Sequence, residues 1–165
     1  MRKLPYKEGT LFAIPLRSGG YGLGLVAHMA PMGKIILAYL FGPMRLELPK
    51  ADELNDLSPD NAVRCLRCGD LGLINGTWPI IGQMKSWAED KWPMPTFVHK
   101  ESLSNRILIR KYSESDPSKL ESQTSVASAG DLEQDGLHGY QAVELILDSV
   151  LKVLQKVLER ERRLL

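Results

Sequence analysis

Two cysteines, Cys65 and Cys68, have the CxxC spacing that occurs in zinc sites and in redox-active pairs. A structural zinc ion needs four ligands, but the chain has no second CxxC, and His28, His99 and His138 are scattered singly. A thioredoxin-type pair starts a helix after a strand, whereas this pair is predicted to end a helix. We therefore interpret both cysteines as buried structural thiols and expect neither a metal site nor a cofactor.

A second chemical motif lies earlier in the chain. Residues 22–27, Gly-Leu-Gly-Leu-Val-Ala, match the G-x-G-x-x-A fingerprint of dinucleotide-binding proteins, and a predicted strand precedes them. The fingerprint needs a helix to follow, because the helix N-terminus binds the pyrophosphate. Only a few residues separate the motif from Pro31, which is too few for a crossover helix. The motif therefore predicts a glycine-rich hairpin strand rather than a nucleotide site.

Other signatures of catalysis are missing from the sequence. It contains no G-x-S-x-G nucleophile elbow, no H-E-x-x-H metalloprotease motif and no D-x-D-x-D-G calcium loop. We expect a protein without enzymatic activity. A deep pocket that contained Asp70, His28 or His99 with a perturbed pKa would favour an enzyme of unrecognised type instead.

The acidic residues gather in two loop regions, residues 47–60 and residues 114–135. Such runs are usually solvated surface, but the first can also form an acidic patch that docks on a basic partner, since complementary charge steers association. Tryptophan is enriched both in cores and at binding hot spots. The residues that we predict to contact a partner are Glu47, Asp52, Glu53, Asp56, Asp60, Trp87 and Trp92.

The first third of the chain is predicted to form antiparallel strands. Alternating apolar residues and glycine-containing turns indicate this arrangement. The predicted strands are Leu11–Leu16, Tyr21–Ala27 and Lys34–Phe41, with turns at 17–20 and 31–33 and an end at Gly42-Pro43. Pro15 cannot donate to a ladder, so it indicates an edge position or a bulge.

The middle of the chain mixes helix, hairpin and loop signals. Ser58 as N-cap with a proline after it predicts a short helix that ends at Gly69. Asn75-Gly76 predicts a two-residue hairpin turn. The predicted hairpin strands are Leu71–Ile74 and Thr77–Ile81, followed by an ordered loop or edge at 87–95, a strand at Arg106–Tyr112 and a mobile polar loop at Ser113–Gly136.

Two interpretations fit the C-terminus. Tyr140–Leu165 can form one long helix, or a strand at Gln141–Leu147 can precede a helix capped by Asp148. We favour the second, because Val143, Leu145 and Leu147 alternate and aspartate is a favoured N-cap.

Composition indicates one domain. The chain has 165 residues, 44% of them apolar, and a net charge of +1, which predicts no whole-molecule attraction to nucleic acid or to a membrane. The start lacks the apolar core of a signal peptide, and two cysteines make no secreted-type disulfide framework, so we expect a cytoplasmic protein. The predicted fold is α+β, with a strongly twisted antiparallel sheet that can be barrel-like, a short middle helix and an amphipathic C-terminal helix. A β-rich core would span residues 1–147 and the helix residues 148–165.

A series of short motifs runs along most of the chain. It contains Gly9-x-x-Phe-Ala-Ile-Pro-Leu16, Gly20-Tyr-Gly-x-Gly24 and Gly69-Asp-Leu-Gly-x-Ile74, with Trp78-Pro79, Trp92-Pro-Met-Pro-x-Phe97 and the 135–144 segment after them. The order of these motifs resembles the immunity protein 26 family of bacterial polymorphic toxin systems. The residues expected to carry the structural motif are Phe12, Pro15, Gly20, Tyr21, Gly22, Gly24, Gly69, Asp70, Asn75, Gly76, Trp78 and Pro79.

The resemblance implies an antidote protein that binds a cognate bacterial toxin, often a nuclease, and protects the producing cell. It supplies no catalytic residues. A small β-barrel adaptor that binds peptide or nucleic acid is the alternative, and the amphipathic C-terminal helix can also mediate self-association.

Overall fold

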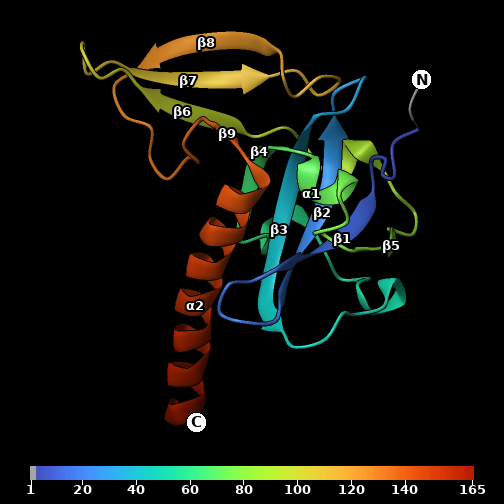
Figure 1. Ribbon diagram of the computed structural model, residues 1–165. Helices are drawn as coiled ribbons and strands as arrows, with labels where there is room; N and C mark the ends of the chain where they lie inside the picture. Colours follow the sequence, from blue (N-terminus) through green and yellow to red (C-terminus); the bar gives the residue numbers. More distant parts are fainter. Residues whose placement is uncertain (1–2) are drawn as a thin grey trace.

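The computed structural model describes residues 3–165, which form two sheets, a long C-terminal helix and several short helical turns (Figure 1). The larger sheet has the strand order β5-β1-β2-β3-β4-β9, and the smaller has the order β6-β7-β8. Neighbouring strands are antiparallel except for β4 and β9, which are parallel. The α+β class is confirmed. The larger sheet is not closed as a barrel, so the barrel-like form is wrong.

The elements have the following bounds. The larger sheet contains β1 (Thr10–Pro15), β2 (Tyr21–Met29), β3 (Ile35–Arg45), β4 (Arg64–Gly69), β5 (Ile80–Gln83) and β9 (Leu137–His138). The smaller sheet contains β6 (Thr96–Lys100), β7 (Ile107–Tyr112) and β8 (Leu120–Val126). The helices are α1 (Leu71–Ile74) and α2 (Tyr140–Leu164), with 3₁₀ turns η1 (Ala51–Glu53), η2 (Pro59–Asn61) and η3 (Glu89–Lys91).

The central strands β2 and β3 are buried on both faces. Because successive side chains of a strand point to opposite faces, the near-continuous apolar run of β3 supplies two cores at once. Val26, Ile36, Ala38 and Leu40 lie on one face, in a core that contains Trp78 and residues of α2. Leu23, Leu25, Leu37, Tyr39 and Phe41 lie on the other, in a core that contains Trp92 and Phe97.

Strand β3 extends further than predicted. It continues through Gly42-Pro43 to Arg45 instead of ending there. The register between β2 and β3 shifts here, from Leu23 opposite Phe41 to Tyr21 opposite Arg45. Pro43 lies within this irregularity, where the regular ladder is interrupted and a residue without an N–H is tolerated.

The C-terminus is one helix, so the predicted split into strand and helix is wrong. Val143, Leu147 and Leu151 recur every four residues, are fully or almost fully buried, and pack on the larger sheet. Asp148 lies inside the helix rather than at its N-cap, and its carboxylate accepts hydrogen bonds from the backbone and hydroxyl groups of Ser18. The alternation of Val143, Leu145 and Leu147 therefore did not indicate a strand, since Leu145 is exposed while the other two are buried.

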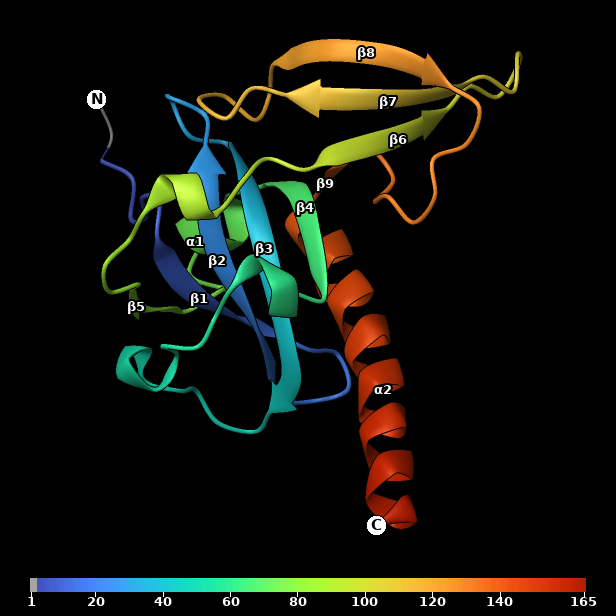
Figure 2. The ribbon, with the colours of Figure 1, turned by 180° about the vertical axis from the view of Figure 1, so that it is seen from behind.

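Glycines let α2 approach the sheet closely. A Cβ on Gly42 would lie 2.5 Å from Leu151 Cδ2, and a Cβ on Gly22 would overlap the side chain of Leu147. The second half of α2 extends beyond the sheet and carries exposed apolar residues such as Val153 and Val157 (Figures 1 and 2). Self-association through this helix stays a prediction.

Three predictions for the middle of the chain are wrong. Residues 64–69, expected to end a helix, form β4, and the helix that starts at Pro59 is the single turn η2. Leu71–Ile74 is a helical turn rather than a hairpin strand. Asn75 ends this turn, and Gly76, at φ +81°, then reverses the chain. The strand that follows, β5, pairs with β1 instead.

The predicted mobile loop at 113–136 contains strand β8, which pairs with β7. Six of its seven residues are exposed, so the strand lacks the apolar alternation by which strands are recognised. The predicted strand at 106–112 is confirmed as β7.

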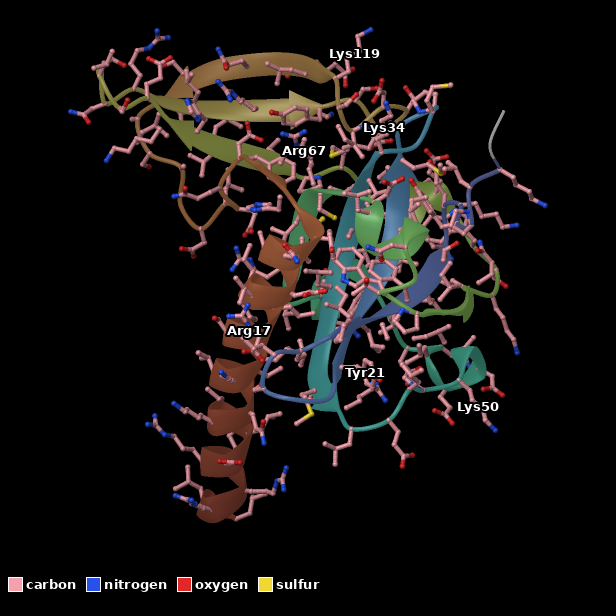
Figure 3. The ribbon with its side chains drawn as sticks, viewed as in Figure 1. Arg17, Tyr21, Lys34, Lys50, Arg67 and Lys119 are labelled. Atoms are coloured by element: carbon pink, nitrogen blue, oxygen red, sulfur yellow. The ribbon has the colours of Figure 1, made fainter. Side chains whose placement is uncertain are left out.

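A buried ionic cluster joins the two sheets. The Asp135 carboxylate accepts hydrogen bonds from Arg67 of β4 at 3.1 Å, from Arg110 of β7 at 3.0 Å and from the Tyr112 hydroxyl at 2.7 Å. The Arg67 guanidinium lies 3.5 Å from the centroid of the Tyr112 ring and also donates to the Pro117 carbonyl at 3.0 Å. Figure 3 shows Arg67 between the two sheets. The cluster therefore fixes how the smaller sheet meets the larger one.

The close contact at Gly24 yields a stability prediction. A Cβ there would lie 2.5 Å from Phe12 Cε2, and the Phe12 ring is held by stacking on Trp78 at a centroid distance of 5.3 Å. We expect Gly24→Ala to lower the free energy of unfolding by about 1–3 kcal/mol through overpacking, as measured by urea denaturation. Gly69→Ala is the matched control, because its Cβ would meet only the Lys34 carbonyl at 3.8 Å. Equal losses in both variants would contradict the prediction.

Acid should weaken the cluster between the sheets. Burial alone would raise the pKa of Asp135, but hydrogen bonds from Tyr112, Arg110 and Arg67 outweigh it and lower the pKa. The carboxylate therefore stabilises the fold above its unfolded pKa of about 3.9, and this stabilisation is lost as the pH falls through the folded pKa.

Asp135→Asn tests that expectation. It removes one partner of a buried ion pair, which costs about 3–5 kcal/mol at pH 7, and it should flatten the acid-dependent loss of stability. Urea denaturation between pH 7 and pH 2 measures both effects. Asp131→Asn, at an exposed position, should behave like the unaltered chain. If all three proteins lose stability in parallel on acidification, Asp135 does not carry the effect.

Candidate partner-binding surface

The predicted contact residues lie in two connections that meet in space. Residues 46–63 join β3 to β4, and residues 84–95 join β5 to β6. Between them is a hollow of about 230 Å³. Its lining comes from both connections and includes Leu54, Asn55, Ser58, Met84, Lys91 and Trp92. We call the surface formed by residues 50–60 and 84–92 the loop surface.

Aromatic packing holds the second connection against the sheet. Trp92 is buried, with its ring edge-on to Tyr39 at a centroid distance of 5.1 Å and to Phe41 at 6.1 Å. Trp87, which is partly exposed, stacks on Trp92 at 6.1 Å. Of the two predicted tryptophans, therefore, Trp87 reaches the surface and Trp92 supports it from below.

Two hydrogen bonds from the sheet reach the backbone of the same connection. Nε2 of His28, on β2, lies 2.5 Å from the Trp92 carbonyl oxygen, and the Tyr39 hydroxyl donates to the Pro93 carbonyl at 2.5 Å. Both anchors are buried and were not predicted as site residues, since no local pattern connects them to the loop.

The first connection is held by its own polar side chains. The Asn61 side chain accepts a hydrogen bond from the Ser58 N–H and donates one to the Asp56 carbonyl, both at 2.9 Å. The Glu53 carboxylate accepts one from the Lys50 N–H at 3.2 Å. Leu54 is buried and fixes η1 to the core. The connection therefore has a defined conformation without long helices.

The loop surface carries net negative charge. It contains six carboxylates and three lysines, a net charge of −3, whereas the whole chain is at +1. Asp52, Glu53, Asp56 and Asp60 are exposed on it. Lys50, labelled in Figure 3, lies at its edge beside η1. Glu47 is also exposed but precedes this surface, near the end of β3.

The predicted motif residues lie in the packing of the fold. Phe12 stacks on Trp78, whose indole N–H donates to Glu144 at 3.2 Å, and Gly22 and Gly24 make room for neighbouring side chains. Gly20, at φ +73°, follows the turn before β2, and Pro15 pairs with Tyr21 across it. The Pro79 carbonyl accepts from the Ala13 N–H at 2.9 Å, and Gly69 ends β4. Asn75 and Gly76 end α1, as described above.

Asp70 also has a structural role. It accepts hydrogen bonds from the Tyr6 hydroxyl at 2.7 Å and from the Lys34 N–H at 2.9 Å. Burial, and then the hydrogen bond to Asp70, raise the pKa of Tyr6. A hollow of about 690 Å³ beside it is lined by Asp70 but, among the described residues, by neither His28 nor His99. Of the three residues that would favour an enzyme, Asp70 therefore lines this hollow and the two histidines do not.

The two cysteines lie on β4, and an offset of three residues places them on opposite faces of the sheet. Cys68 is buried in the core under α2, and Cys65 packs against the other core. They therefore cannot share one metal ion. Among residues 3–165, Glu8, His28 and Glu89 are the set close enough to share an ion.

Comparison with known families identifies the chain. The family model of immunity protein 26 matches residues 7–107, more than half of the chain, and the protein belongs to this family. No match to a curated protein or to a solved structure was found. The matched range includes the whole loop surface but not β8, β9 or α2. No helix in the described part of the chain is long and apolar enough to cross a membrane.

The thiols provide a test of the β4 assignment. Burial, and then the charge of Asp70, raise the pKa of Cys68 to about 12. In a Cys65→Ser variant, Cys68 should therefore stay unreactive toward Ellman's reagent at pH 8 while the protein is folded, since the thiolate is the reactive form. In urea the same thiol should react readily, with a pKa near its ordinary value of about 8.5. Rapid reaction of the folded protein would contradict this burial.

Proposed function

We propose that this protein binds a toxin protein made by the same bacterium and neutralises it by covering the toxin's active surface. Membership of an immunity family supports the role, and the loop surface supplies a place for the contact. The proposal places the complex in the cytoplasm and requires no chemistry from the immunity protein itself.

The negative charge of the loop surface is the observation that carries this proposal. Six carboxylates in two connections with defined conformations complement a basic surface, such as the nucleic-acid-binding face of a nuclease. Because Trp92 and Asn61 already hold the connections in place, binding would cost little ordering entropy. Trp87 offers an aromatic contact next to the charges.

Nucleic acid is a less suitable partner for this surface. Nucleic-acid binding depends on lysine and arginine side chains that neutralise the phosphates. A surface with a net charge of −3 repels those phosphates instead. The charge therefore favours a basic protein over nucleic acid.

Charge removal tests the surface. In the triple variant Asp52→Asn, Asp56→Asn, Asp60→Asn the carboxylates are lost, but none of them accepts a hydrogen bond that holds the connection. Binding would be measured with purified candidate toxins encoded by genes next to this one. We expect the association rate constant to fall about tenfold or more, with a weaker salt dependence, because electrostatic steering is reduced.

A matched control changes the same number of charges elsewhere. The variant Glu114→Gln, Glu121→Gln, Asp131→Asn alters exposed carboxylates outside the loop surface and should bind as the unaltered protein does. Equal weakening by the two triple variants would refute the loop surface as the contact. The absence of a complex with every neighbouring toxin candidate would refute the proposed function.

A further inference from the structure

Glu8, His28 and Glu89 come from three separate segments and converge at the loop surface, to which Glu89 itself belongs. Glu8 precedes β1, His28 lies on β2, and Glu89 begins η3. One potential ligand atom from each lies within 4.8 Å of the other two. The distance between His28 Nδ1 and Glu89 Oε1 is 3.5 Å. The group contains one nitrogen donor and two carboxylates.

The hydrogen bond of His28 defines which ring nitrogen is free. Nε2 lies 2.5 Å from the Trp92 carbonyl oxygen, and a carbonyl can only accept, so Nε2 carries the proton and donates. In the neutral ring, Nδ1 then has a lone pair. This atom is buried, has no hydrogen-bond partner and faces a carboxylate oxygen. Both atoms carry lone pairs, so a positive charge between them would make this 3.5 Å approach favourable.

That positive charge is either a second proton on His28 or a bound cation. An imidazolium would neutralise only one of the two carboxylates, whereas a divalent cation would neutralise both. With one nitrogen ligand and two carboxylates in the group, the charge balance favours a divalent cation.

The geometry also resembles that of protein metal ligands. Histidines that bind metals usually donate their second N–H to a carbonyl or carboxylate, as His28 does to Trp92. Ligand atoms at about 2.1 Å from a tetrahedral ion lie roughly 3.4 Å apart, close to the 3.5 Å between His28 and Glu89. The Glu89 side chain is half exposed, so it can adjust to complete the coordination.

We propose that Glu8, His28 Nδ1 and Glu89 bind one divalent transition-metal ion of the zinc class, with water in the remaining position. Mixed nitrogen and carboxylate ligands suit Zn²⁺ or Co²⁺ better than Ca²⁺ or Mg²⁺, which prefer oxygen alone. The ion would tie the N-terminal segment and η3 to β2, and so brace the loop next to Trp87 and Trp92. The site does not depend on the proposed toxin binding.

The test uses the full-length protein by itself. After treatment with EDTA and dialysis, Zn²⁺ is titrated by calorimetry, and Co²⁺ binding is followed by visible absorption. We expect one ion per chain and a Co²⁺ spectrum without intense thiolate charge-transfer bands. Glu8→Gln and Glu89→Gln should each weaken Zn²⁺ binding at least about 10–100-fold, the loss that even outer-shell ligand partners cause.

Two matched controls separate this site from other metal binding. Glu121→Gln, on exposed β8, and the double variant Cys65→Ser, Cys68→Ser should keep the affinity unchanged. Circular dichroism verifies that each variant folds. If no stoichiometric Zn²⁺ binding occurs, or if binding survives both Glu8→Gln and Glu89→Gln, the metal site is refuted.

Discussion

The fold depends on the burial of one antiparallel strand pair, β2 with β3, on both faces. An antiparallel sheet often leaves one face in water, but here alternate residues of both strands enter two separate cores. Each face therefore needs its own cover. Helix α2 and Trp78 cover one, and the irregular connection around Trp92, with Phe97 of β6, covers the other. Irregular chain that closes a core is held by that core, which is why the loop surface has a defined shape.

The junction of the two sheets is held by charged groups rather than by apolar packing alone. Arg67, Arg110 and Asp135 form a largely desolvated ionic cluster, and such clusters add little net stability compared with apolar packing. Their directional hydrogen bonds instead select one arrangement of the sheets. The smaller sheet thus keeps a fixed position although its edge strand β8 buries almost nothing.

The sequence allowed part of this fold to be predicted, for reasons visible in particular residues. Strands β1, β2 and β7 each contain a short apolar run of strand length, so each was recognised. Strand β4 was misassigned because Ser58-Pro does start a helical turn, but η2 stops after one turn. Helix α1 was misassigned because Asn75-Gly76 does turn the chain, but the strand after it, β5, pairs with β1. In both cases tertiary packing decides how far the local structure extends or which strand it pairs with. The same limit applies to α2, since Val143 and Leu147 fit both a strand and a helix.

In the candidate sites, too, the sequence identifies residue types, whereas tertiary packing decides which of them meet. Composition alone identified the acidic residues and tryptophans, but their meeting around one hollow depends on how two distant connections fold. Glu8, His28 and Glu89 are separated by 20 and 61 residues, so no spacing rule could group them. His28 links the two sites. Its Nε2 holds the Trp92 backbone, and its Nδ1 faces Glu89. A positive charge that neutralises the carboxylates would therefore also fix the ring that holds the loop surface in place.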